Sequence, residues 1–135
     1  PLANGVLTSS PNHWCVGIDF SNWGHLTDRG GRYYSWANVE VPSSKIFYDD
    51  EGNPWELYTE DAMEAYSELM LALSIELDID RDMHYRHSDT SPTRKTDPGP
   101  ALPFHSILDH VYDFVNSYRE SLDENRRGED DPDEV

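Results

Sequence analysis

The stretch "RHSDTSPTRKTDPGPALP", residues 86–103, is dense in both turn-forming and chemically active residues. It holds one histidine, two aspartates, one lysine, two arginines, four prolines and one glycine. Proline fixes the backbone φ angle and pushes the preceding residue toward extended conformations, so the run predicts a stiff loop. A stiff loop around a histidine and an aspartate indicates a place where side chains are held in fixed positions.

Helical periodicity lies on both sides of this loop. Apolar residues recur at three- and four-residue intervals over 60–77, Thr59 is a plausible N-cap, and Glu60 and Asp61 suit the positive end of the helix dipole. A second helix is predicted over about 103–122, where apolar residues again line one face. We expect the apolar stripe over 60–77 to belong to the core.

The strongest strand prediction is "HWCVGIDFS", residues 13–21, a short apolar run with β-forming residues. Asp19 lies near its end, and burying a carboxylate is costly unless it is paired or bound to something. Cys15 is the single cysteine, so no internal disulfide forms, and we expect it to be a small buried hydrophobic residue. The alternating "MHYRH", residues 83–87, predicts a second short strand that leads into the loop.

Turn signals fill the region between the first strand and the first helix. Residues 22–36 carry glycines among aromatic residues and predict a turn or hairpin, and residues 37–58 predict an irregular segment with one or two short strands. The sequence therefore predicts one α/β domain over residues 1–122. In that domain we expect helices 60–77 and 103–122 to pack against a mixed central sheet.

The composition is strongly acidic. The formal net charge of −17 at pH 7 argues against nucleic acid, whose phosphates require lysine and arginine, and against anionic membrane surfaces. Residues 123–135 are rich in acids and poor in apolar residues, which predicts a solvated, disordered tail. No run is long or apolar enough to span a membrane and no signal peptide opens the chain, so we expect a cytoplasmic or virion-associated protein.

His87 and Asp97 are the first pair of residues to consider for chemistry. Neutral imidazole and carboxylate are both zinc ligands, and the stiff loop between them has the length to return Asp97 to the end of the segment that carries His87. Lys95 precedes Asp97 by two residues, so in an extended stretch both side chains point the same way. A surface histidine beside a polar loop is the plainer alternative, and the spacing by itself leaves both open.

The stretch "HSDTSPTRKTDPGPALP", residues 87–103, resembles the signature of the zinc-dependent N-acetylmuramoyl-L-alanine amidases. This family contains phage lysozyme-type amidases and bacterial anhydromuropeptide amidases, and its R-K-x-D-P-G-P run is intact here. "NHWCVGIDFSNWG", residues 12–24, resembles a strand of the family, and "LYTEDAMEAYSELMLAL", residues 57–73, resembles the helix that follows that strand. The three segments agree in order and spacing, and the resemblance covers roughly residues 12–115.

The resemblance implies a role for each of four residues. His87 and Asp97 would be zinc ligands, Lys95 would stabilise the oxyanion, and Asp19 would stand where the family has its catalytic acid, usually Glu. The implied substrate is the amide between the lactyl group of muramic acid and L-alanine in peptidoglycan. Zinc would polarise its carbonyl and lower the pKa of a bound water to about 7. Asp19 would move the proton of that water, and Lys95 would face the developing negative charge.

The chain also departs from the family pattern. A histidine on an early strand is the family's first zinc ligand, and that strand belongs before residue 12. Another chain supplying this N-terminal part, a degenerate relative, or His13 acting as a replacement ligand would each explain the difference. Arg86 and Thr93 stand where the family has glycines, and Asp19 is a methylene shorter than Glu.

Three functions therefore stand side by side. The first is a peptidoglycan amidase, from a phage lysin or a virion-associated cell-wall hydrolase. The second is a non-catalytic amidase-like module that binds peptidoglycan or builds an assembly. The third is a plain acidic globular domain without a site. A bound zinc ion and a histidine supplied from elsewhere would separate the first from the second.

Overall fold

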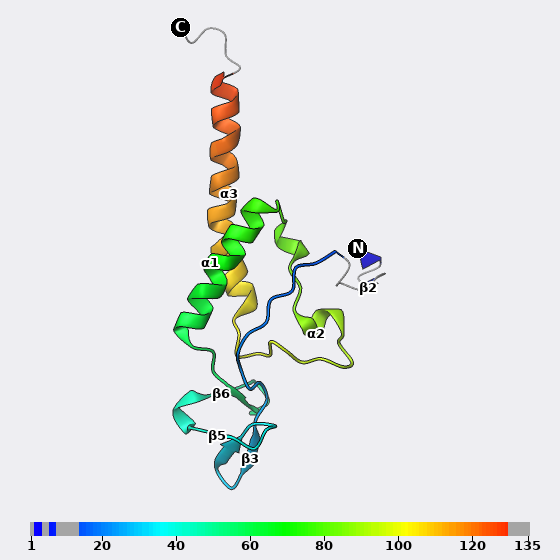
Figure 1. The fold of residues 1–135 in the computed structure, drawn as a ribbon, viewed down its shortest axis with the longest axis vertical. Coiled ribbons are helices and arrows are strands. Elements are labelled where there is room, and N and C mark those ends of the chain that lie inside the picture. Colours follow the sequence, from blue (N-terminus) through cyan, green and yellow to red (C-terminus); the bar gives the residue numbers. More distant parts are fainter. Residues whose placement is uncertain (1, 4–5, 8–13, 130–135) are drawn as a thin grey trace. The chain divides into compact units, whose positions relative to one another are not determined.

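The computed structural model describes residues 2–3, 6–7 and 14–129. They form two compact units (Figure 1). Unit 1 comprises the described residues up to Thr59 together with Tyr85–Leu102, and unit 2 comprises Glu60–His84 with the described residues from Pro103 onward. The chain has both helices and strands, as the sequence predicts, with the strands in unit 1 and the two long helices in unit 2.

Every strand pair in the described residues is antiparallel. The strands form separate small sheets: β1 (Leu2–Ala3) with β2 (Val6–Leu7); β4 (Arg32–Tyr34) with β3 (Thr27–Arg29) and β5 (Glu40–Val41); and β6 (Ile46–Tyr48) with β7 (Pro54–Glu56). The expected mixed central sheet is therefore not found in this part of the chain. Strands joined by tight turns pair antiparallel, whereas a parallel pair requires a long crossover connection.

The hairpin of β3 and β4 is confirmed, and its turn explains the two adjacent glycines. Gly30 and Gly31 both have positive φ angles, of 65° and 87°, as a two-residue hairpin turn requires. The Asp28 carboxylate accepts the Gly31 N–H at 2.9 Å and closes the turn. Beneath these strands lies a small core of Leu26, Val41 and Ile46, with Trp23 and Tyr33 packed against it.

A carboxylate organises the turn between β6 and β7. Asp49 accepts hydrogen bonds from the backbone of Glu51 (3.0 Å) and Asn53 (2.8 Å), and from the indole Nε1 of Trp55 (3.1 Å). Desolvation acts to raise the pKa of Asp49, but these hydrogen bonds outweigh it and the pKa is lowered. Trp55 is therefore fixed in unit 1 at both its backbone and its ring.

Unit 2 is built on the two predicted helices. α1 (Glu60–Glu76) begins with two acids in its first turn and α3 (Phe104–Glu129) is longer than expected. The two helices pack against each other. Their buried residues recur at helical spacing, so each helix contributes one apolar face to this contact. These residues are Tyr66, Met70 and Ser74 of α1, and Phe104, Ile107, Leu108, Val111, Tyr112 and Val115 of α3.

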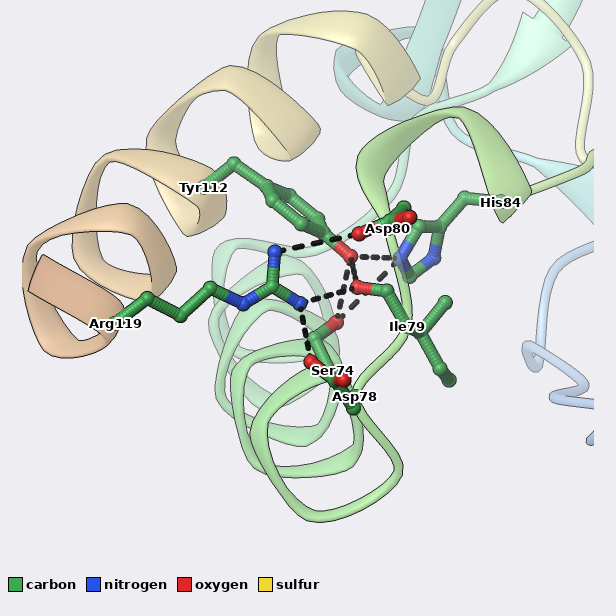
Figure 2. A network of polar contacts seen from close by, with 7 residues as sticks. All are labelled: Ser74, Asp78, Ile79, Asp80, His84, Tyr112 and Arg119. Carbon is green, nitrogen blue, oxygen red and sulfur yellow. Dashed lines mark hydrogen bonds and ion pairs between the residues drawn. The ribbon is translucent and has the colours of Figure 1, made fainter. Parts of the chain in front are cut away.

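A buried polar network ties the connection after α1 to α3 (Figure 2). The Tyr112 hydroxyl donates to the carbonyl of Ile79 at 2.6 Å, and it lies 2.6 Å from His84 Nε2 and 3.2 Å from Ser74 Oγ. Because the one hydroxyl proton goes to Ile79, Nε2 of His84 is the donor to Tyr112. Arg119 adds bonds to the Ile79 carbonyl (3.1 Å) and to the exposed carboxylate of Asp78 (3.1 Å).

Two strand predictions are wrong. The described part of 13–21 forms no strand, Asp19 and Cys15 are exposed rather than buried, and His13 lies outside the described residues. The apolar run has no partner strand among the described residues, and an unpaired run does not become a strand. Residues 83–87 also form no strand. The 3₁₀ turn η3 (Arg81–Met83) precedes His84, which bonds to Tyr112 of α3, and the chain then forms the short helix α2 (His87–Thr90).

Part of the predicted tail has structure. Residues 123–129 belong to α3, and residues 130–135 lie outside the described part of the chain. Within the described residues, no helix has the combination of length and apolar composition that a membrane crossing requires.

Candidate functional site

The structure brings His87 and Asp97 into direct contact. Nδ1 of His87 lies 2.9 Å from Oδ2 of Asp97, although ten positions separate them in the chain. The backbone supports this contact, because the N–H of Ser88 donates to the carbonyl of Asp97 at 3.0 Å. The side chains are 44% and 61% exposed, so solvent and ligands reach both. The pair is therefore a fixed arrangement of two metal-binding residue types that is open to solvent.

Short helix α2 and the turn after it give the loop its internal order. Arg86 holds the Asp89 carboxylate with Nε (3.0 Å) and Nη2 (2.9 Å), and its backbone N–H donates to the same group. These hydrogen bonds raise the pKa of Arg86 above its ordinary value. The carbonyl of Ser91 then accepts the N–H groups of Arg94 (3.0 Å) and Lys95 (2.9 Å). Arg86 thus fastens the start of the segment that carries His87.

Unit 1 also fastens the far end of the loop. The Tyr58 hydroxyl donates to the carbonyl of Pro98 at 2.6 Å. Gly99 has φ of 77° and lies against the six-membered ring of Trp55. The peptide bond between Asp97 and Pro98 is cis. The residues that directly follow Asp97 are therefore in contact with β7 and the segment after it.

Lys95 and Asp19 are not joined to the pair. Lys95 is half-buried, and no ion pair links it to an acid in the described part of the chain. Asp19 is exposed on an irregular segment that is held at both ends by aromatic contacts, Trp14 with Tyr85 (6.0 Å) and Phe20 with Tyr58 (5.3 Å). The contact at Tyr85 places one end of this segment next to the start of the loop, but in the described part of the chain no hydrogen bond or ion pair joins Asp19 to His87 or Asp97.

The pair fits two positions of a zinc site. Two ligand atoms on a tetrahedral zinc ion stand about 3.4 Å apart, so Nδ1 and Oδ2 would separate by only about 0.5 Å to share one ion. If the proton stays between them instead, Asp97 fixes the ring of His87 and leaves Nε2 as the open ligand or base. The described residues contain no group of three or more metal-binding side chains, so they do not complete the three-ligand set of a catalytic zinc.

Sequence reasoning missed Tyr58 and Trp55. Both residues are far from the loop in the sequence, and nothing in the sequence around Tyr58 indicates that its hydroxyl bonds to this loop. Gly99 gave the only local signal, because a glycine between two prolines in a turn indicates positive φ. Comparisons of the chain with protein-family models, with curated proteins and with solved structures give no match.

Proposed function

We propose that this chain is part of a zinc-dependent peptidoglycan amidase, and that unit 1 corresponds to the region of such a domain that carries two of its zinc ligands. One observation carries the proposal: His87 and Asp97, the two ligands implied by the amidase-like motif, lie 2.9 Å apart at the ends of a fastened loop. Histidine–aspartate hydrogen bonds also form in plain polar loops, but here the bonded pair is the one that the amidase-like motif implies. We therefore favour a site over a domain without one.

His87 and Asp97 would hold the metal. A bound zinc ion supplies Lewis acidity toward an amide carbonyl and acidifies a water molecule. The exposure of both side chains leaves room for water and for a polymeric substrate beside them. A third ligand would come from a partner chain or from residues outside the described ones.

Asp19 and Lys95 would act on the substrate rather than on the metal. Asp19 is exposed and would accept a proton from the attacking water and pass it to the leaving amine of L-alanine. Lys95 is two residues from Asp97, and its ammonium group would face the carbonyl oxygen as negative charge develops there. The setting we infer is a phage lysin or a virion-associated hydrolase acting on the cell wall.

A non-catalytic amidase-like module is the second candidate. The observation that favours it is the donor count, because the described residues offer two ligands rather than three. Such a module would bind peptidoglycan or join a larger assembly without cutting the amide.

The test is an assay on purified peptidoglycan with zinc added, with products identified by mass spectrometry. The proposal predicts a new amine on L-alanine and a new carboxyl on the lactyl group of muramic acid. His87→Ala and Asp97→Ala should lose this product, whereas His110→Ala and Asp113→Ala, two exposed positions on α3, should keep it. If the chain binds peptidoglycan but no new amine on L-alanine appears, the result would contradict the enzyme and favour the non-catalytic module.

A further inference from the structure

Tyr58 makes the hydrogen bond that fixes the residue directly after Asp97. Its hydroxyl donates to the Pro98 carbonyl at 2.6 Å across forty positions of sequence. Tyr58 is only 8% exposed, so the donor side of this bond is buried, and its ring makes an edge contact with Phe20 at 5.3 Å. A hydrogen bond from a ring that is itself packed restricts the carbonyl it binds, because the buried donor is held in one place.

Trp55 supplies a second restraint one residue further along. Gly99 lies so close to the Trp55 ring that a Cβ there would stand 2.8 Å from two ring carbons. The ring cannot yield freely, since its Nε1 donates to Asp49 at 3.1 Å and the His25 ring packs edge-on at 5.1 Å. The backbone after Asp97 is therefore held by a hydrogen bond at Pro98 and by packing at Gly99.

Asp97 also affects Tyr58. Burial, followed by the negative charges of Asp97 and Glu56, raises the pKa of Tyr58 to about 12. The hydroxyl therefore remains protonated, and remains a donor to Pro98, at any pH at which a cell-wall hydrolase would work. Ionisation of Tyr58 therefore does not break the hydrogen bond to Pro98 in this pH range.

We propose that Tyr58 and Trp55 are positioning residues that hold the Asp97 carboxylate against His87, and so set the geometry of the proposed metal site from outside its loop. This inference rests on the proposed function for its consequence, which is metal affinity. Its structural part stands on the contacts at Pro98 and Gly99 alone. Groups that orient a metal ligand commonly change metal affinity by about 10–100-fold when removed.

The test uses the full chain with Tyr58→Phe, which removes the donor and keeps the ring. Tyr66→Phe is the matched control, because Tyr66 is also 8% exposed but lies on α1 in unit 2. Hydrogen exchange by NMR, without added metal, compares the Ser88 amide, which donates to the Asp97 carbonyl, with the Leu26 amide, which donates to Pro54 at 2.9 Å in the same unit. Zinc affinity is then measured by competition with a chromophoric chelator.

Tyr58→Phe should raise the exchange rate of Ser88 relative to that of Leu26 about fivefold, as expected for the loss of one hydrogen bond, and Tyr66→Phe should leave this ratio unchanged. Tyr58→Phe should also weaken zinc binding about tenfold. Trp55→Phe, which removes the ring atoms that contact Gly99, should act in the same direction.

The two measurements separate the two claims. An unchanged Ser88-to-Leu26 ratio, or equal acceleration of both amides, would overturn the positioning role. Wild-type affinity for zinc in Tyr58→Phe would overturn it as well. A wild-type chain that binds no zinc would count against the proposed function, while the exchange ratio would still decide whether Tyr58 holds Asp97 in place.

Discussion

Gly99 lies so close to Trp55 that a Cβ added to the glycine would stand 2.8 Å from ring atoms Cε3 and Cζ3 of the indole. Its φ of 77° is also unfavourable for any other residue. Any other residue at position 99, two residues after Asp97, would therefore meet both backbone strain and a packing conflict.

Gly99→Ala should therefore destabilise the chain more than an alanine at a comparable glycine. Gly24 is the matched control, because its φ of 73° is similar while nothing lies within 4 Å of an added Cβ. Both variants share a strain of about 1–2 kcal/mol, and Gly99→Ala adds about 1–3 kcal/mol for overpacking. Urea unfolding, monitored by tryptophan fluorescence, measures the free energy of unfolding of both variants. Equal losses would show that Trp55 does not confine Gly99.

The Tyr112 hydroxyl should contribute strongly to the stability of unit 2. Tyr112 is 3% exposed, and Tyr112→Phe removes a hydroxyl that bonds the buried Ser74 and the half-buried Ile79 and His84. A loss of about 1–3 kcal/mol in the free energy of unfolding follows. Tyr118→Phe, on the exposed side of the same helix, should change it by less than about 0.5 kcal/mol. Calorimetry measures the stability of both variants. Similar losses in Tyr112→Phe and Tyr118→Phe would contradict the network in Figure 2.

Stability should fall in mild acid because of His84. Burial, and then the charge of Arg81, lowers the pKa of His84 below 6.5 in the folded chain, so the unfolded chain binds this proton more readily. The stability that depends on neutral His84 is present above pH 6.5 and is lost as the pH falls through the folded pKa. Protonation would also place a charge beside Tyr112, which faces Asp80, Asp82 and Arg119 as well.

The measurement is urea unfolding of the wild type, His84→Gln and His105→Gln at several pH values between 8 and 5. His84→Gln should flatten the profile, whereas His105→Gln, at an exposed position of α3, should follow the wild type. A wild-type profile as flat as that of His84→Gln would show that His84 does not titrate with folding.

The helices and the hairpin could be predicted because their signals are local. The apolar stripe over 60–77 has the period of a helix, and the observed α1 covers all of it except the last residue. The pair Gly30–Gly31 has the conformational freedom that its turn requires. The proximity of His87 and Asp97 could also be predicted from the sequence, because the prolines restrict the paths that the loop between them can follow. Their roles as zinc ligands stay a prediction.

The remaining features depend on partners distant in the sequence. Residues 13–21 have strand composition, but a strand forms only when another strand accepts its backbone hydrogen bonds, and the described residues supply none. The residues around His84 alternate in polarity as in a strand, yet His84 forms a hydrogen bond with Tyr112, which is 28 positions away in the sequence. Tyr58 and Trp55 contact the loop for reasons of tertiary packing that composition and periodicity do not carry.

The most direct test of the central claim is the zinc content of the purified chain after dialysis against zinc and then against metal-free buffer, by elemental analysis. The account predicts about one zinc per chain, as a single mononuclear site holds, and its loss in both His87→Ala and Asp97→Ala. His110→Ala and Asp113→Ala should retain the metal. Zinc retained by both of the first two variants, or absent from the wild type, would contradict a metal site that the purified chain holds by itself at the His87–Asp97 pair.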